Sequence, residues 1–428
     1  MTDTLDAPTT PASPQPAAEP PVATVIQLTA FDPEARVDPY PRLKALREAA
    51  PVFNDDFAKT TVLTRYADVK AVVNDRSLWR SPLLAEEGAL MRRNIEASLA
   101  QTPPGERERA GSILLMDDPD HQRIREPLAR ALYARVAAMK PEIEAVVGEV
   151  IGRVEGRGRF DLIGEVAIPI PITVIARVLG VDPDRYDEFR AWSEAAILFL
   201  NPMLDEAQRA HMEWGSAAIG AYFEQLMAER RRAPRADLIS DMVRLQAEGA
   251  PLSDAEVRTN LAALLIGGNL TTTDLIGNGV RLLLTYPEEL AKFRADPALA
   301  AGLVEEVLRF DPPVDGTGRV ASRDMEVGGC PVARRRGLTA SLRAANRDPA
   351  VFPDPDRFDI TRRNGPHVAF GGGSHICIGA PLARIEAKAA FTELFRRFPD
   401  LRLAEQTLTW RALPFFRGLE RLELETGA

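Results

Sequence analysis

The sequence contains few residues that could cross-link the fold through disulfides or bind a metal ion through several side chains. It has only two cysteines, Cys330 and Cys377, and four histidines, none of them spaced as His-x-x-x-His. Two cysteines cannot form a disulfide framework or a cysteine-rich zinc site. An iron–sulfur cluster is excluded as well, because it takes four cysteine ligands.

Long apolar runs and an excess of positive charge are also missing. The most apolar stretch, residues 166–181, is interrupted by Pro169, Pro171 and Arg177, and a bilayer-spanning helix needs about 20 apolar residues. The net charge of −9 argues against a nucleic-acid partner. Residues 1–28 are rich in Pro, Ala and Thr and predict a disordered tail rather than a secretory signal. We expect a monomeric cytoplasmic protein with no membrane or nucleic-acid partner.

One glycine-rich stretch, residues 370–379, carries the second cysteine. It reads Phe-Gly-Gly-Gly-Ser-His-Ile-Cys-Ile-Gly, and a helical pattern follows it. Glycine lets the main chain approach closely, so backbone N–H groups can reach the sulfur of Cys377. The positive end of the following helix favours a thiolate, which is a metal ligand. A lone loop cysteine can also be a small buried residue or a free thiol, and glycines before a helix also bind phosphate or simply turn.

The longest helical pattern begins at Ser253 with a capping box, Ser-Asp-Ala-Glu, and runs to about Leu284. A helix of that length measures about 45 Å and suits an axial position in the molecule. Gly267, Gly268 and the hydroxyl of Thr271 lie in its middle, where they weaken the helix and permit a kink. Such a groove can hold oxygen and water.

Two further pairs have helical spacing. His121 and Arg125 share one face of a predicted helix, which suits a buried dianion but is also typical of a solvated basic face. Glu306 and Arg309 form a Glu-x-x-Arg pair across one helical turn, a pattern that many helices carry by chance.

Together, these segments resemble the cytochrome P-450 family. Residues 370–379 match its haem-ligand signature Phe-x-x-Gly-x-His-x-Cys-x-Gly at every fixed position, and Gly267, Gly268 and Thr271 match its oxygen-side pattern. The motifs occur in the family's order over about residues 30–425. The resemblance implies a single mainly α domain over residues 29–428 with a small β-rich lobe, and a haem b (iron protoporphyrin IX) between the long helix and the cysteine loop.

The resemblance also implies roles for individual residues. Cys377 is the expected iron ligand, and Glu306, Arg309 and Arg357 are expected to lock the loop that leads to it. The expected cofactor-binding residues are His121, Arg125, Arg319 and His375 at the propionates, with Phe370, Gly371, Gly379 and Gly268. The expected substrate pocket is lined by Leu264, Gly267, Val314, Thr317, Phe415 and Phe416.

The chain departs from the family at Leu270, where an acid that helps deliver protons usually stands. A leucine cannot relay protons. Asp274 lies one helical turn further on, so we expect Asp274 or Asn269, with water, to replace the missing acid beside Thr271. The alternative is that Asp274 is solvated or paired structurally.

The implied activity is a monooxygenase reaction on a lipophilic small molecule with O2 and two electrons. No flavin- or cluster-binding extension is present, so the electrons are expected from a ferredoxin (or flavodoxin) and its NAD(P)H-dependent reductase. Arg123, Arg130 and Arg384 are candidates for a basic docking patch. Because of Leu270, two alternatives stay open: a haem-thiolate enzyme that uses peroxide or catalyses rearrangement or dehydration, and a haem-binding sensor without turnover.

Overall fold

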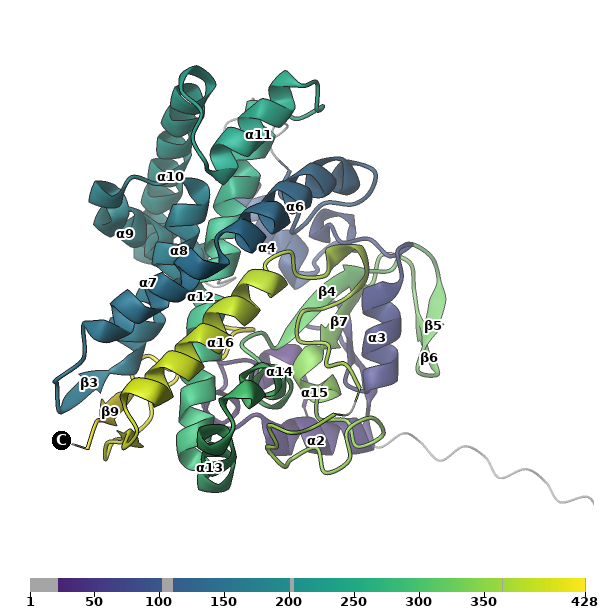
Figure 1. The fold of residues 1–428 in the computed structure, drawn as a ribbon. Helices are drawn as coiled ribbons and strands as arrows, with labels where there is room; N and C mark the ends of the chain where they lie inside the picture. Colours follow the sequence, from purple (N-terminus) through teal and green to yellow (C-terminus); the bar gives the residue numbers. More distant parts are fainter. Residues whose placement is uncertain (1–21, 102–110, 201–203, 364, 428) are drawn as a thin grey trace, which may run out of the picture.

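The computed structural model describes residues 22–101, 111–200, 204–363 and 365–427. The fold is mostly helical with small sheets (Figure 1). The helices are α1 (Pro33–Val37), α2 (Tyr40–Ala49), α3 (Tyr66–Asn74), α4 (Leu90–Gln101), α6 (Asp120–Ala138), α7 (Lys140–Gly152), α8 (Pro169–Leu179), α9 (Tyr186–Ala196), α10 (Glu206–Arg232), α11 (Leu238–Ala247), α12 (Asp254–Thr285), α13 (Pro287–Ala295), α14 (Ala300–Phe310), α15 (Leu342–Ala345) and α16 (Ala380–Arg397). The strands are β1 (Val52–Asp55), β2 (Thr60–Leu63), β3 (Arg159–Asp161), β4 (Gly316–Val320), β5 (Met325–Val327), β6 (Cys330–Val332), β7 (Gly337–Ser341), β8 (Arg402–Leu403) and β9 (Glu423–Glu425).

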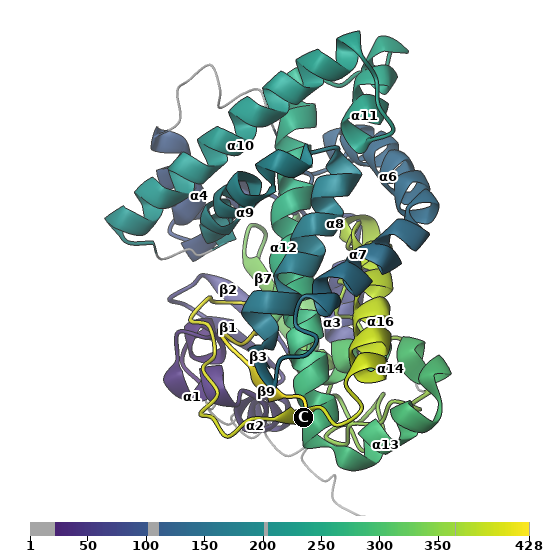
Figure 2. The ribbon, with the colours of Figure 1, turned by 60° about the vertical axis from the view of Figure 1, so that its left-hand side comes forward.

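Helix α12 is the axis of the molecule, as the sequence predicts. The Ser253 side chain accepts the N–H of Glu256 at 3.2 Å, and the Glu256 carboxylate accepts the N–H of Ser253 at 2.8 Å. This reciprocal capping box fixes the first turn. The helix then runs for 32 residues through the centre of the fold, with α8, α10, α14 and α16 packed around it (Figure 2).

The β-rich lobe lies beside this helical body and holds a four-stranded sheet in the order β1-β2-β7-β4. The β1–β2 hairpin is antiparallel, whereas β2 and β7 run parallel. Strand β4 pairs antiparallel with β7 and places Arg319 opposite Leu338. The sheet thereby fixes the position of an expected propionate-binding arginine.

The predicted boundary of the N-terminal tail is wrong at its end. Residues 25–28 form a 3₁₀ helix, and Val22, Val25 and Leu28 are buried. The Asp55 carboxylate accepts the Val25 N–H at 2.6 Å, which ties this segment to β1. Composition hid these apolar contacts, because the surrounding residues are those of a disordered chain. Residues 1–21 lie outside the described residues.

None of the described helices, within the ranges given above, is both long enough and apolar enough to cross a membrane. The longest, α12, carries Asp274, Asn278 and Arg281 along its second half.

Candidate haem site

The cysteine loop is a tight turn that ends at the N-terminus of α16. The N–H of Cys377 donates to the carbonyl of Phe370 at 3.0 Å, which closes the loop on itself. The N–H groups of Gly379 and Ala380 donate to the sulfur. The close approach to sulfur therefore comes from the start of α16.

The glycines of the loop have a different neighbour. Gly371 and Gly373 have φ of +70° and +64°, a conformation that favours glycine. A Cβ on Gly372 would lie 2.8 Å from the side chain of Val73, and one on Gly373 would lie 2.6 Å from the Val73 carbonyl. Gly372 and Gly373 thus let the loop pack against α3, whereas the glycine of the loop whose N–H reaches the sulfur is Gly379.

The sulfur of Cys377 faces internal space. The Cys377 side chain is exposed, yet desolvation by the surrounding protein raises the pKa of the thiol. The two N–H groups, Arg125 and Arg384 act in the opposite direction and lower that pKa. Donors and cations gathered around one sulfur favour its use as an anionic ligand once a metal binds.

The middle of α12 is open on one side. A Cβ built on Gly267 or Gly268 would meet no heavy atom within 4 Å. The Thr271 hydroxyl donates to the Gly267 carbonyl at 2.8 Å, and the helix is uninterrupted through this turn. Small residues therefore leave room beside the helix at the predicted oxygen-side position.

The predicted propionate partners converge on one region. The imidazole rings of His121 and His375 lie with their centroids 4.0 Å apart and their planes tilted by 32°, and Arg125 donates to the carbonyl of Ile376. Arg319 donates to the Val73 carbonyl at 3.1 Å and lies close enough to His375 to lower its pKa. The pKa of His375 falls to about 2, first because of burial and then because of His121 and three arginines.

One buried nitrogen in this region has no partner among the described residues. His121 is 1% exposed; its Nδ1 contacts Asp118 at 3.1 Å, whereas its Nε2 is buried without a hydrogen-bond partner. A cluster of cationic groups with an orphaned nitrogen fits the two carboxylates of a haem. With the cysteine loop and the open turn of α12, the residues present fit a haem, and a mostly helical fold with this site defines the class of haem-thiolate proteins.

Two chain segments form the predicted pocket wall. Val314 and Phe416 pair as an isolated β-bridge, and the N–H of Asp315 donates to the Phe415 carbonyl at 2.9 Å. Phe415 has φ of +64°, a left-handed conformation that costs a side-chain-bearing residue roughly 1–3 kcal/mol. Thr317 is the second residue of β4, three residues beyond Val314, and Leu264 is buried in α12. The strained turn fixes the backbone positions from which the side chains of Phe415 and Phe416 extend.

Asp274 is paired rather than free. It is 1% exposed, and its carboxylate forms an ion pair with Arg411, whose side chain is 23% exposed. Gly418 lies against this pair. Leu270 and Asn269 are both buried in the preceding turn. The only signal for Arg411 in the sequence was its place near the last predicted pocket turn.

The predicted lock behind the loop is correct for two residues and wrong for the third. Glu306 forms a bidentate pair with Arg309, with both N···O distances at 2.8 Å. The second arginine on Glu306 is Arg362 at 3.3 Å, not Arg357, whose side chain is exposed and which contributes only its carbonyl. The chain turns between these two arginines, so the side chain of Arg357 is exposed whereas that of Arg362 reaches Glu306.

Comparisons with known proteins agree with this class. The sequence model of the family described as Cytochrome P450 matches residues 181–410. Cytochrome P450 107B1 of Saccharopolyspora erythraea is 38% identical over 413 residues, which are 94% of this chain and 99% of that protein. The 6-deoxyerythronolide B hydroxylase of the same organism is 35% identical over 393 residues, 90% and 95% of the two chains.

Solved structures show the same fold. The crystal structure of CalO2 superposes with a TM-score of 0.86 at 29% identity, covering 95% of this chain and 99% of that one. The chain belongs to the cytochrome P450 family, and it is an oxidoreductase of the monooxygenase type. Membership in the family implies a haem cofactor.

One buried acid on α16 was not predicted. Glu386 is 1% exposed, both carboxylate oxygens lack a hydrogen-bond partner among the described residues, and burial raises its pKa to about 8. Between pH 4.5 and 8 the unfolded chain releases this proton and the folded chain retains it, so stability falls as the pH rises through this window.

We expect Glu386→Gln to remove that dependence. The quantity to compare is the free energy of unfolding of the variant minus that of the parent. This difference should be larger at pH 8 than at pH 5 by on the order of 3 kcal/mol. Thermal midpoints of both holoproteins, measured from pH 5 to pH 8.5, check this. A difference between the two midpoints that stays constant across the range contradicts it.

Proposed function

We propose that this chain is a haem b monooxygenase in which Cys377 is the iron ligand and a lipophilic small molecule is the substrate. The observation that supports it most is the Cys377 sulfur, which accepts two backbone N–H groups and faces internal space. When bound, a haem with a thiolate ligand activates O2 for insertion of one oxygen atom into a C–H bond.

The protein's own residues have distinct tasks in this proposal. His121, Arg125, Arg319 and His375 bind the propionates and hold the cofactor in one orientation. Phe370, Gly371, Gly379 and Gly268 leave room for the flat macrocycle. The Thr271 hydroxyl, which donates to Gly267 in this structure, holds water or a proton on the oxygen side.

The substrate class follows from the pocket wall and from the relatives. Leu264, Val314, Phe415 and Phe416 are apolar, with Gly267 and Thr317 as the smaller members of the set. One relative is named for hydroxylation of 6-deoxyerythronolide B. We propose a lipophilic substrate of that general kind for this chain.

We further propose that Asp274 replaces the acid missing at position 270, acting with Asn269 and water. Asp274 is buried, while its partner Arg411 is partly exposed, so the pair connects the interior of α12 with the surface. Asp274→Asn keeps the shape but removes the proton-carrying group. We expect about tenfold less product per O2 consumed, because general acid catalysis typically contributes more than that.

The matched control for Asp274 is Arg411→Met, which breaks the same ion pair and leaves the acid. Product per NADPH and per O2 should fall in Asp274→Asn by more than in Arg411→Met. Equal coupling in the parent and in Asp274→Asn would remove Asp274 from the reaction and leave it a structural partner of Arg411.

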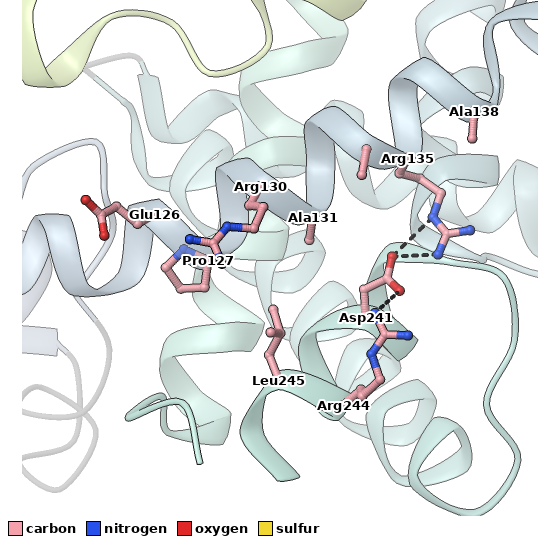
Figure 3. Close-up of a pocket in the computed structure, with 10 residues that line it drawn as sticks. Glu126, Pro127, Arg130, Ala131, Arg135, Ala138, Asp241, Arg244 and Leu245 are labelled. Atoms are coloured by element: carbon pink, nitrogen blue, oxygen red, sulfur yellow. Dashed lines mark hydrogen bonds and ion pairs between the residues drawn. The ribbon is translucent and has the colours of Figure 1, made fainter. Parts of the chain in front are cut away.

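We propose that electrons arrive from a ferredoxin or flavodoxin with its NAD(P)H-dependent reductase, and that Arg130 contributes to docking. Of the three candidate arginines, Arg123 pairs with Glu256 at 2.6 Å and Arg384 with Glu305 at 2.6 Å. Arg130 has no ion-pair partner within the described chain. It lines a surface groove of about 480 Å³ between α6 and α11, beside the Arg135–Asp241–Arg244 ion pairs (Figure 3).

Arg130→Glu should slow reduction by an acidic ferredoxin about tenfold at low salt, because steering between opposite charges raises association rates. The parent's rate should fall as ionic strength rises. Arg232→Glu on α10 makes the same charge change elsewhere and is the control. Stopped-flow reduction that is equal in both variants and insensitive to salt contradicts docking at Arg130.

The activity is tested with ferredoxin, reductase, NADPH and a panel of macrolactones, steroids and fatty acids. Turnover under ¹⁸O2 should give a product that carries one heavy oxygen atom. Product formation with hydrogen peroxide but none with O2 and reductant would favour a peroxide-driven enzyme, which the buried Leu270 makes the second candidate.

A further inference from the structure

Arg80 lies next to the haem site but belongs to none of the motifs in the sequence. Its Nε donates to the carbonyl of Leu114 at 2.8 Å. Its Nη1 donates to the Thr317 hydroxyl at 3.1 Å and to the Gly318 carbonyl at 2.6 Å. Its Nη2 has no hydrogen-bond partner within the described residues and is not among the fully buried orphaned atoms. One nitrogen of the fork is therefore free and borders open space.

The surroundings of Arg80 are strongly positive. The pKa of Arg80 is lowered to about 10, mainly by burial and then by Arg319, and Arg80 in turn lowers the pKa of His375. The nearby carboxylate of Asp117 accepts the backbone N–H groups of Arg80 and Ser81 at 2.5 and 3.1 Å. Asp117 raises the pKa of both Arg80 and Arg319, so this one carboxylate offsets part of two positive charges. A further anion beside the two arginines would stabilise them.

We propose that the free Nη2 of Arg80 donates to a haem propionate, as a fifth member of the set His121, Arg125, Arg319 and His375. This inference rests on the haem site proposed above. Because the same guanidinium donates to the Leu114 carbonyl, the propionate would be linked to Leu114 through one side chain.

The test is haem retention in the purified holoprotein. Arg80→Gln keeps a polar group but loses the charge and the fork, and Arg80→Lys keeps only the charge. Transfer of haem to excess apomyoglobin should be about tenfold faster in Arg80→Gln and about threefold faster in Arg80→Lys, as for loss of one charge-assisted hydrogen bond. Arg76→Gln, which changes an exposed arginine shortly before Arg80 in the chain, should match the parent. Equal transfer rates in the parent, Arg80→Gln and Arg80→Lys overturn the proposal.

Haem dimethyl ester separates a propionate contact from a purely structural role. In protein reconstituted with the ester, which has no carboxylate, Arg80→Gln and the parent should release the cofactor at the same rate. If Arg80→Gln still releases the ester tenfold faster, Arg80 acts only on the chain and the proposal is wrong. Unchanged haem retention together with weaker binding of hexadecanoic acid, but not of its methyl ester, would assign Arg80 to a substrate carboxylate instead. A parent protein that binds no haem would refute the proposed function itself.

Discussion

Cys377→Ala is expected to abolish oxygen insertion, with product formation falling to background under the conditions of the parent enzyme. The alanine leaves the loop geometry intact, since the hydrogen bond from residue 377 to the Phe370 carbonyl uses the main chain. What disappears is the sulfur that accepts the Gly379 and Ala380 N–H groups. Without a thiolate the iron loses the ligand that favours O–O cleavage.

The control for this variant is Cys330→Ala, which removes the other cysteine of the chain. Cys330 lies in β6 of the small hairpin, where its sulfur is 3.9 Å from the Asn54 amide nitrogen. Turnover and haem content of Cys330→Ala should equal those of the parent. Retained turnover in Cys377→Ala would contradict the assignment of the iron ligand.

Glu306→Ala is expected to give a protein that fails to hold haem. Glu306 is 3% exposed and accepts hydrogen bonds from Arg309, Arg362 and the N–H of Asp359. Its removal leaves buried arginines without a counter-charge, a change that costs on the order of 3–5 kcal/mol. Haem content per protein and the thermal midpoint measure the loss, and a normal haem content would contradict it.

The same cluster allows a paired test of the corrected lock. Arg362→Ala removes a side chain that contacts Glu306 and should lower both haem content and thermal midpoint. Arg357→Ala removes an exposed side chain and keeps the main-chain carbonyl of residue 357, which is the group that contacts Arg309. Haem content and thermal midpoint should therefore stay nearly unchanged. A larger loss of haem and of thermal stability in Arg357→Ala than in Arg362→Ala would contradict the observed contacts. It would identify Arg357, as the sequence predicts, as the second arginine of the Glu306 cluster.

Several elements follow from local chemistry, and these were predictable. The capping box at Ser253 determines where α12 begins. Two residues of the candidate haem site were predicted from spacings that resemble the family, Cys377 from the glycine-rich loop and His121 from its distance to Arg125 in the sequence. In each case a short stretch of chain contains both the residue and the reason for its role.

The errors share a different cause, which is contact between distant segments. Arg80 reaches Thr317, and Asp274 reaches Arg411, across more than a hundred residues of sequence. Val22 and Val25 are buried against β1 although their composition resembles a disordered tail. Arg362 replaces Arg357 because a loop turns between them. No periodicity or spacing carries information about such pairs, since tertiary packing alone determines them.

The assignment of Cys377 as the thiolate ligand of a haem is tested most directly by the spectrum of the reduced protein with carbon monoxide. The parent should show the long-wavelength Soret band of a thiolate-ligated haem, and Cys377→His should lose that band while still binding haem. A parent protein with the shorter-wavelength band of a histidine-ligated haem, or an unchanged band in Cys377→His, would contradict the assignment.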